Sequence, residues 1–289
     1  MKRGRIASLA LALFFARSFV LDSFGSDVYA SSLGNAKGAV APAGAGQYYY
    51  GQLPDEAKGF YEAMYNMYTQ GIFKTGTGDY DLVANGHVTQ EQLSGYASGN
   101  MALLSYMGAA RDAFYADYPE IFYVDFSYLS LRVTQKGSTY CAYLGPGRSD
   151  NYFVQGFASQ GEVEAAIAEY EARVASIVDG ANNLTVEEGK DLEEQKIKYA
   201  HDEIIFNTSY RMEDTCTKEN IGHIRTAYGA LIKGESLCEG YARAVKSVLD
   251  KLGIPCILVQ GGFQRTTDRI EPHMWNYVQA GGAWYGLDA

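Results

Sequence analysis

Cysteine is scarce in this chain, with four residues in 289. A small extracellular fold that depends on a disulfide framework needs a much higher density of cysteine. That class of protein is therefore excluded. Cys141 and Cys216 could still form one bridge in an oxidising compartment, and two buried thiols are the open alternative.

Long apolar segments are also missing, because beyond residue 30 no run approaches the 18 residues of a membrane-spanning helix. The apolar run at residues 6–16 is too short to span a bilayer and is followed by Arg17. Basic residues at 2–5 precede it, and the small-residue sequence Val-Tyr-Ala closes the segment at residues 28–30. This arrangement predicts a cleaved signal peptide over residues 1–30, and a mature protein that is secreted or held at the cell surface with no membrane span of its own.

Basic residues are the minority, with 24 Lys and Arg against 34 Asp and Glu. Removing residues 1–30 leaves a formal charge of −12. A chain of this charge repels a phosphate backbone, so nucleic acid is excluded as a partner. The next stretch, residues 31–46, is rich in Gly, Ala and Ser and predicts a flexible leader.

The remaining sequence predicts two modules of mixed helix and strand with a boundary near residues 180–184. The first, residues 47–182, is expected to be an α/β module in which three aromatic and β-branched runs between residues 121 and 157 form strands. The second, residues 183–289, is expected to be α+β. Capping boxes predict the starts of three helices: Thr89 with Gln92, Ser159 with Glu162, and Thr185 with Glu188.

One stretch of the second module, "GESLCEGYARAVKSVLDKLGIP", combines a turn, a cysteine and a regular amphipathic helix. Apolar residues recur at helical spacing from Tyr241 to Leu252, and Gly253 ends the pattern. Cys238 therefore falls in the first helical turn, where unpaired backbone N–H groups favour an anionic sulfur. Cys256, in the apolar run "IPCILV", is expected to be a core residue.

Histidine is limited to four positions, of which His87 and His201 lie in polar surroundings and His223 in a loop, where it remains a weaker candidate for a catalytic base. The fourth, His273, lies in "EPHMWNYVQAGGAWYGLDA", which predicts two strands joined by a two-residue Gly-Gly turn. Such a turn makes Asp288 the diagonal cross-strand neighbour of His273 on the same face, whereas a three-residue loop would separate them.

The cysteine helix, "HMWNYV" and "WYGLDA" together resemble the bacterial transglutaminase-like domains, over roughly residues 190–289. "YAHDEIIFNTSY" and "TAYGALIKGESLCEGYA" are similar to segments that precede the cysteine in that family, and "FYADYPEIFYVDFSYLSLRV" is similar to a module found ahead of such domains in secreted bacterial proteins. The resemblance implies an α+β, papain-like core with a Cys, His, Asp triad. It also implies that the aspartate strand continues, so a chain ending at Ala289 is expected to be truncated there.

Carried over to this sequence, Cys238 is the expected nucleophile, His273 the general base and acid, and Asp288 the residue that orients the imidazole. The backbone N–H of Cys238 is the expected first oxyanion donor. The candidates for further oxyanion or substrate contacts are Asn207, Tyr210, Tyr228 and Trp275, the last of which is expected to pack over the triad. The Cys, His and Asp spacings match no common metal-ligand pattern, so neither a metal nor another cofactor is expected.

Two functions remain open at this point. The first is a secreted cysteine enzyme that acts on amide bonds of extracellular or cell-wall peptides or proteins, as a peptidase or amidase or as a protein-glutamine transamidase. The second is a catalytically silent binding or scaffolding module at the cell surface. The sequence does not specify calcium dependence, the substrate or the oligomeric state.

Overall fold

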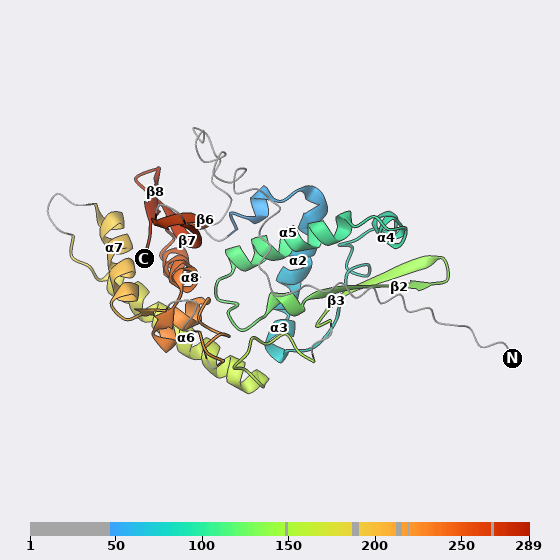
Figure 1. Ribbon diagram of the computed structural model, residues 1–289, viewed down its shortest axis with the longest axis horizontal. Helices are drawn as coiled ribbons and strands as arrows, with labels where there is room; N and C mark the ends of the chain where they lie inside the picture. The colour runs from blue at the N-terminus through green and yellow to red at the C-terminus, as the bar shows by residue number, and fades with distance from the viewer. Residues whose placement is uncertain (1–46, 148–149, 187–190, 212–215, 219, 267–268) are drawn as a thin grey trace.

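The computed structural model of the protein describes residues 47–147, 150–186, 191–211, 216–218, 220–266 and 269–289. The predicted signal peptide and leader lie outside these residues. Helices and mainly antiparallel sheets occupy largely separate stretches of the chain, so the fold is α+β, as predicted (Figure 1).

Two long helices, α2 (Asp55–Thr69) and α5 (Ala102–Asp117), pack against each other in the amino-terminal half. Helix α2 begins directly after Pro54 and carries two acidic residues in its first turn, both of which favour a helix start. Shorter helical segments complete this half: η1 (Tyr50–Gln52), α3 (Ile72–Thr75), α4 (Gln90–Ala97) and η2 (Phe126–Tyr128).

Capping residues set the starts of the next helices. Thr89 and Gln92 form the predicted capping box ahead of α4, and Ser159 accepts the N–H of Glu162 at the start of α6 (Gln160–Asn182). The third expected start is wrong: α7 (Leu192–Ile205) begins after Asp191, whose carboxylate accepts two backbone N–H groups. Of the predicted third box, Glu188 lies outside the described residues.

The amino-terminal sheet has the order β1-β3-β2, from β1 (Tyr80–Asp81), β2 (Ser130–Lys136) and β3 (Thr139–Gly145). All its pairings are antiparallel, so this half is α+β rather than α/β. The third predicted strand, in the run 151–157, is also wrong and reduces to one bridge between Val124 and Phe153. The neighbouring Tyr152 N–H bonds Gly76 O instead of a strand.

The carboxyl-terminal half is built around α8 (Cys238–Lys251), which packs against the sheet β6-β7-β8 and contacts both α6 and α7 (Figure 1). The strands are β6 (Cys256–Thr266), β7 (Arg269–Ala280) and β8 (Ala283–Leu287). Short segments lead into α8: β4 (Ser209–Tyr210), the π-helical turn η4 (Gly229–Lys233) and β5 (Glu235–Ser236). Gly281 and Gly282 form the predicted two-residue turn, with φ of +55° and +80°, and Ala280 pairs with Ala283.

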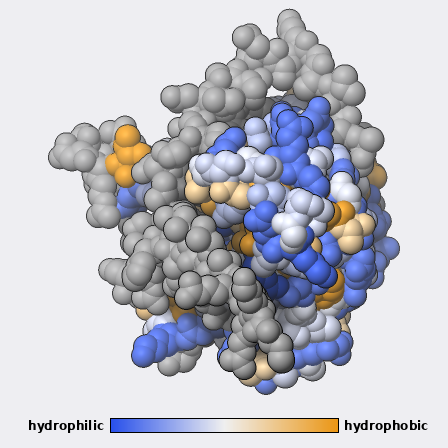
Figure 2. Space-filling view, turned by 90° about the vertical axis from the view of Figure 1, so that its right-hand side faces the viewer, coloured by the Kyte–Doolittle hydropathy of each residue, from blue (hydrophilic) through white to orange (hydrophobic). Residues whose placement is uncertain are grey.

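Buried apolar residues form one continuous core that reaches from Leu53 in the first half to Ala280 on β7. Among the described residues, no helix is long and apolar enough to cross a membrane. Hydrophilic residues predominate in the described part of the face shown in Figure 2, with small hydrophobic areas between them. No disulfide joins Cys141 to Cys216, both of which are described.

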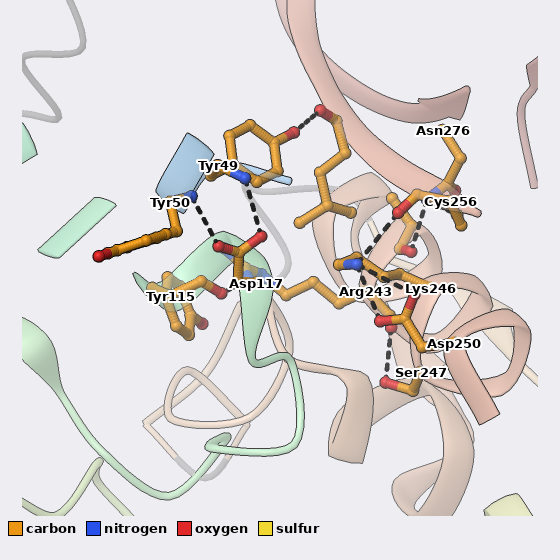
Figure 3. A network of polar contacts seen from close by, with 12 residues as sticks. Tyr49, Tyr50, Tyr115, Asp117, Arg243, Lys246, Ser247, Asp250, Cys256 and Asn276 are labelled. Atoms are coloured by element: carbon orange, nitrogen blue, oxygen red, sulfur yellow. Dashed lines mark hydrogen bonds and ion pairs between the residues drawn. The ribbon is translucent and has the colours of Figure 1, made fainter. Parts of the chain in front are cut away.

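Polar contacts also tie the two halves together (Figure 3). Asp117, at the end of α5 and 2% exposed, accepts the backbone N–H groups of Tyr49 and Tyr50, both at 3.0 Å. The Tyr49 hydroxyl donates to Leu258 O on β6. Burial raises the pKa of Asp117 to about 6, against the hydrogen bonds that it accepts. The strap of residues 49 and 50 is thus held between α5 and the carboxyl-terminal sheet.

Candidate active site

The start of α8 is held by a short hydrogen-bonded segment. Leu237 is the N-cap residue, and its N–H donates to Ile224 O at 2.9 Å. The buried Ser236 hydroxyl lies within hydrogen-bond distance of Ile224 O at 3.0 Å and Leu237 O at 2.9 Å. Cys238, half-buried, is the first residue of the helix, as predicted. Its sulfur lies at the end of a helix where backbone N–H groups lack intrahelical partners and an anion is stabilised.

His273 and Asp288 come together as the two-residue turn requires. The hairpin register aligns Asn276 with Leu287, which puts Asp288 one position further along. His273 Nε2 lies 3.0 Å from each carboxylate oxygen of Asp288. The side chain of His273 is 19% exposed and that of Asp288 57%. Because Nε2 faces the carboxylate, Nδ1 is the nitrogen left to exchange a proton with another group.

Aromatic rings flank the imidazole. Trp275 stacks on His273 with ring centroids 5.9 Å apart and an interplanar angle of 21°, and Phe263 lies 5.6 Å away. Gly261, paired with His273 across β6 and β7, leaves the space that Trp275 occupies: a Cβ there would lie 2.7 Å from the indole Cη2. Trp275 therefore packs beside the imidazole, in the position expected from the sequence.

Helix α8 and strand β7 run in the same direction. Asn276 Nδ2 donates to Ala242 O at 3.0 Å, and Lys246 Nζ, four residues further along α8, donates to Cys256 O at 3.0 Å. Cys256 pairs with Val278, which lies two residues further along β7 than Asn276. Residues later in α8 therefore lie beside residues later in β7, so the helix and the strand are parallel.

By the same register, Cys238 and His273 lie toward one end of this layer. Cys238 is one helical turn before Ala242, and His273 is three residues before Asn276. Side chains alternate along a strand, so His273 and Asn276 project to opposite faces of β7. In the described part of the chain no hydrogen bond joins Cys238 to His273. The structure therefore joins the imidazole and the carboxylate on one face of β7, and places α8, which carries the thiol at the same end, against the opposite face.

Two other histidines also have acidic partners. His223 Nε2 lies 3.1 Å from Oε1 of Glu235, and Glu235 is three residues before Cys238 in the chain. Burial lowers the pKa of His223. His201 Nδ1 lies 3.1 Å from Asp202 Oδ1, and its Nε2 lies 3.4 Å from the backbone oxygen of Asp288. The sequence of α7 did not predict the contact between His201 and the backbone of Asp288. A second imidazole thus borders the His273 and Asp288 pair.

The sequence-predicted oxyanion candidates occupy three different settings. Asn207 is exposed and its Nδ2 donates to Glu203 O at the end of α7. Tyr210, on β4, stacks on Tyr241 of α8 with centroids 6.0 Å apart.

Tyr228 is 4% exposed and stacks on Phe122, with ring centroids 4.5 Å apart. It therefore belongs to the contact between the two halves of the molecule. Among the described residues, no three His, Cys, Asp or Glu side chains cluster in a way that would hold a metal ion.

Comparison with known proteins shows a family similarity for one part of the chain. Residues 180–289 match the model of the transglutaminase-like superfamily. No curated protein matches the sequence. Solved structures with partial similarity to this chain include three proteins whose TM-scores are all below 0.5.

The first is the crystal structure of a TGase, with 15% identity, a TM-score of 0.35, and coverage of 55% of this chain and 43% of that chain. The second is a candidate cysteine protease from Cytophaga hutchinsonii, with 12% identity, a TM-score of 0.31, and coverage of 55% and 61% respectively. The third is a candidate protease from Parabacteroides distasonis, with 16% identity, a TM-score of 0.29, and coverage of 56% and 36%. This chain thus spans between about a third and three fifths of those proteins. The residues that match the transglutaminase-like superfamily model include α8, the His273 strand and Asp288.

Proposed function

We propose that the protein is an extracytoplasmic cysteine enzyme that acts on amide bonds of peptides or proteins through a thioester on Cys238. The observation that carries the proposal is the bond between His273 Nε2 and Asp288, which leaves Nδ1 available. A cysteine at a helix start and the family match over residues 180–289 support it.

The chemistry begins with proton transfer from the Cys238 thiol to His273 Nδ1. The thiolate attacks the amide carbonyl carbon, and the negative charge moves to the oxygen, for which the backbone N–H of Cys238 is the proposed donor. Collapse of this intermediate breaks the C–N bond, and the imidazolium returns its proton to the leaving amine. A thioester on Cys238 remains, and Asp288 keeps the imidazole in the tautomer that this cycle requires.

The second step determines the class of product. Attack by water on the thioester releases an acid, which is hydrolysis or deamidation, whereas attack by a primary amine forms a new amide. In either case His273 removes a proton from the incoming group and Cys238 leaves as the thiolate. We propose a polypeptide outside the cytoplasm as the substrate, in keeping with the predicted signal peptide, and the division into modules at residues 47–182 and 183–289 is part of the same proposal.

The test measures the rate at which iodoacetamide alkylates Cys238 between pH 4 and 9, with the modified residue identified by peptide mass spectrometry. A thiolate paired with an imidazolium reacts below pH 6, whereas an ordinary thiol reacts only as it ionises near pH 8.5. Cys256 is an internal reference, because burial raises its pKa to about 12 and shields it from the reagent.

The chain offers a matched control for the imidazole. His273→Ala should remove the reaction below pH 6, and His223→Ala, which deletes a histidine with an equally close carboxylate partner, should keep it. A wild-type profile that rises only near pH 8.5 and is the same in both variants would refute the enzyme proposal. The silent binding module would then be the function that remains.

A further inference from the structure

Asn276 is a buried amide between the sheet and the helix that carries Cys238. Its side chain is 0% exposed, and it points from β7 toward α8 (Figure 3). Nδ2 donates to Ala242 O at 3.0 Å and lies 3.3 Å from Cys256 Sγ. One amino group thus contacts both the helix and the first residue of β6.

The carbonyl oxygen of the Asn276 amide lacks a hydrogen bond among the described residues. Within the described part of the chain, Asn276 Oδ1 is buried and has no hydrogen-bond partner. A buried acceptor without a partner destabilises the folded state, and an apolar residue at this position would avoid that cost. The contribution of Asn276 therefore lies in its donor end, which fixes one carbonyl of α8.

The bond to the Ala242 carbonyl can fix how far α8 lies along the sheet. A helix that packs on a sheet through apolar side chains alone can slide, because hydrophobic contact is not directional. A slide of one turn moves the helix by about 5.4 Å, more than the reach of a hydrogen bond. The Asn276 bond to Ala242, one turn after Cys238, opposes such a slide at the end of α8 that carries the thiol, and the bond from Lys246 Nζ to Cys256 O opposes it further along the helix.

We propose that Asn276 is a positioning residue that sets the register of α8 along β7, and with it the separation of Cys238 from His273. The proposal rests on the proposed function, because the separation matters only if the thiol and the imidazole exchange a proton. Asn276 itself touches neither the reacting sulfur nor the substrate in this scheme.

The first test compares the pH profile of Cys238 alkylation in Asn276→Ala with that in Ser247→Ala. Ser247 is a matched control: it is 6% exposed, lies on α8, donates to Arg243 O at 2.8 Å and contacts the Tyr170 hydroxyl at 2.6 Å. Both variants lose a buried hydrogen bond of α8 and should lose thermal stability. Asn276→Ala should slow alkylation at pH 6 at least tenfold, whereas Ser247→Ala should stay within twofold of wild type.

The second test does not require a functioning enzyme. Met274→Cys places a second thiol two residues before Asn276, on the face of β7 that α8 covers, and dibromobimane joins two thiols only when they are close. Cross-linking of residues 238 and 274, measured by fluorescence and peptide mapping, should proceed in that variant and in its combination with Ser247→Ala. Adding Asn276→Ala should reduce the rate at least fivefold.

These two readouts separate the possible failures. If wild-type alkylation shows no reaction below pH 6, the enzyme proposal fails, and the cross-linking result still decides the role of Asn276. If Asn276→Ala and Ser247→Ala lower the melting temperature equally and leave both the pH profile and the cross-linking rate unchanged, Asn276 is a core residue only and the inference is overturned.

Discussion

Replacement of Asp117 by Asn is predicted to change how the stability of the protein depends on pH. Asp117 is 2% exposed, and burial raises its pKa to about 6 although Tyr49, Tyr50 and Tyr61 all donate hydrogen bonds to it. Asn has nearly the same shape and cannot ionise. Its amide offers one acceptor oxygen in place of two.

The sign and the size follow from proton linkage. The folded protein binds the Asp117 proton more tightly than the unfolded chain, whose aspartate titrates near pH 3.9. The stabilising contribution is therefore present in full below pH 4 and is lost as the pH rises through 6. A difference between pKa values of about 6 and about 3.9 corresponds to about 3 kcal/mol.

The assay is urea unfolding at pH 4, 5, 6 and 7, followed by the fluorescence of the two tryptophans. Other carboxylates are present in both proteins, so their contributions cancel in the difference between wild type and Asp117→Asn. The advantage of wild type should shrink by about 2 kcal/mol between pH 4 and 7, because part of the full difference is already lost at pH 4. Asp112→Asn, on the exposed side of the same helix, reports the effect of removing a charge from a surface position.

One result would refute the reasoning. If the difference between wild type and Asp117→Asn is the same at pH 4 and at pH 7, the three donors offset the burial of the charge and the carboxylate is not strained. The strap of residues 49 and 50 would then be held equally well over the whole range.

Three further substitutions test the packing of α8 and α5. Gly240→Ala should lower the free energy of unfolding by about 3 kcal/mol in calorimetry, because the added Cβ would overlap the Ser236 hydroxyl. Gly108→Ala, in α5 with nothing within 4 Å, should instead raise it by about 0.5–1 kcal/mol, and a loss there would contradict the packing described. Arg243→Lys should cost about 2 kcal/mol, because the guanidinium lies 3.5 Å from the Tyr115 ring centroid and a lysine cannot stack there; an unchanged melting temperature would argue against this contact.

Local chemistry made the carboxyl-terminal half predictable. The Gly281 and Gly282 turn fixes the strand register, and the register fixes which residue meets His273. The helix start at Cys238 followed from the turn before it and the apolar period after it. Each of these inferences uses contacts close in sequence, where geometry leaves little choice.

The wrong predictions concern segments whose structure depends on contacts with residues distant in the sequence. Tyr152 lies in an aromatic run that predicts a strand, yet its N–H bonds Gly76 O and its hydroxyl bonds Gly78 O, so a loop takes the place of a neighbouring strand. Thr185 and Asp191 are both good capping residues, and their side chains alone do not show which begins a helix. The bond from Asn276 to Ala242 has no counterpart in any periodic pattern, so the placement of α8 on β7 was beyond sequence reasoning.

The contacts that join the two halves determine when the molecule can be completed. Arg243 bonds the carbonyl of Tyr115 across 128 residues, and Tyr49 bonds that of Leu258 across 209. A ribosome makes Tyr49 and Tyr115 long before it makes Leu258 and Arg243. While the amino-terminal half emerges, these two tyrosines therefore lack their carboxyl-terminal partners. The final structure therefore forms only after residue 258 has been made, and until then the chain stays open to chaperones, proteases and aggregation.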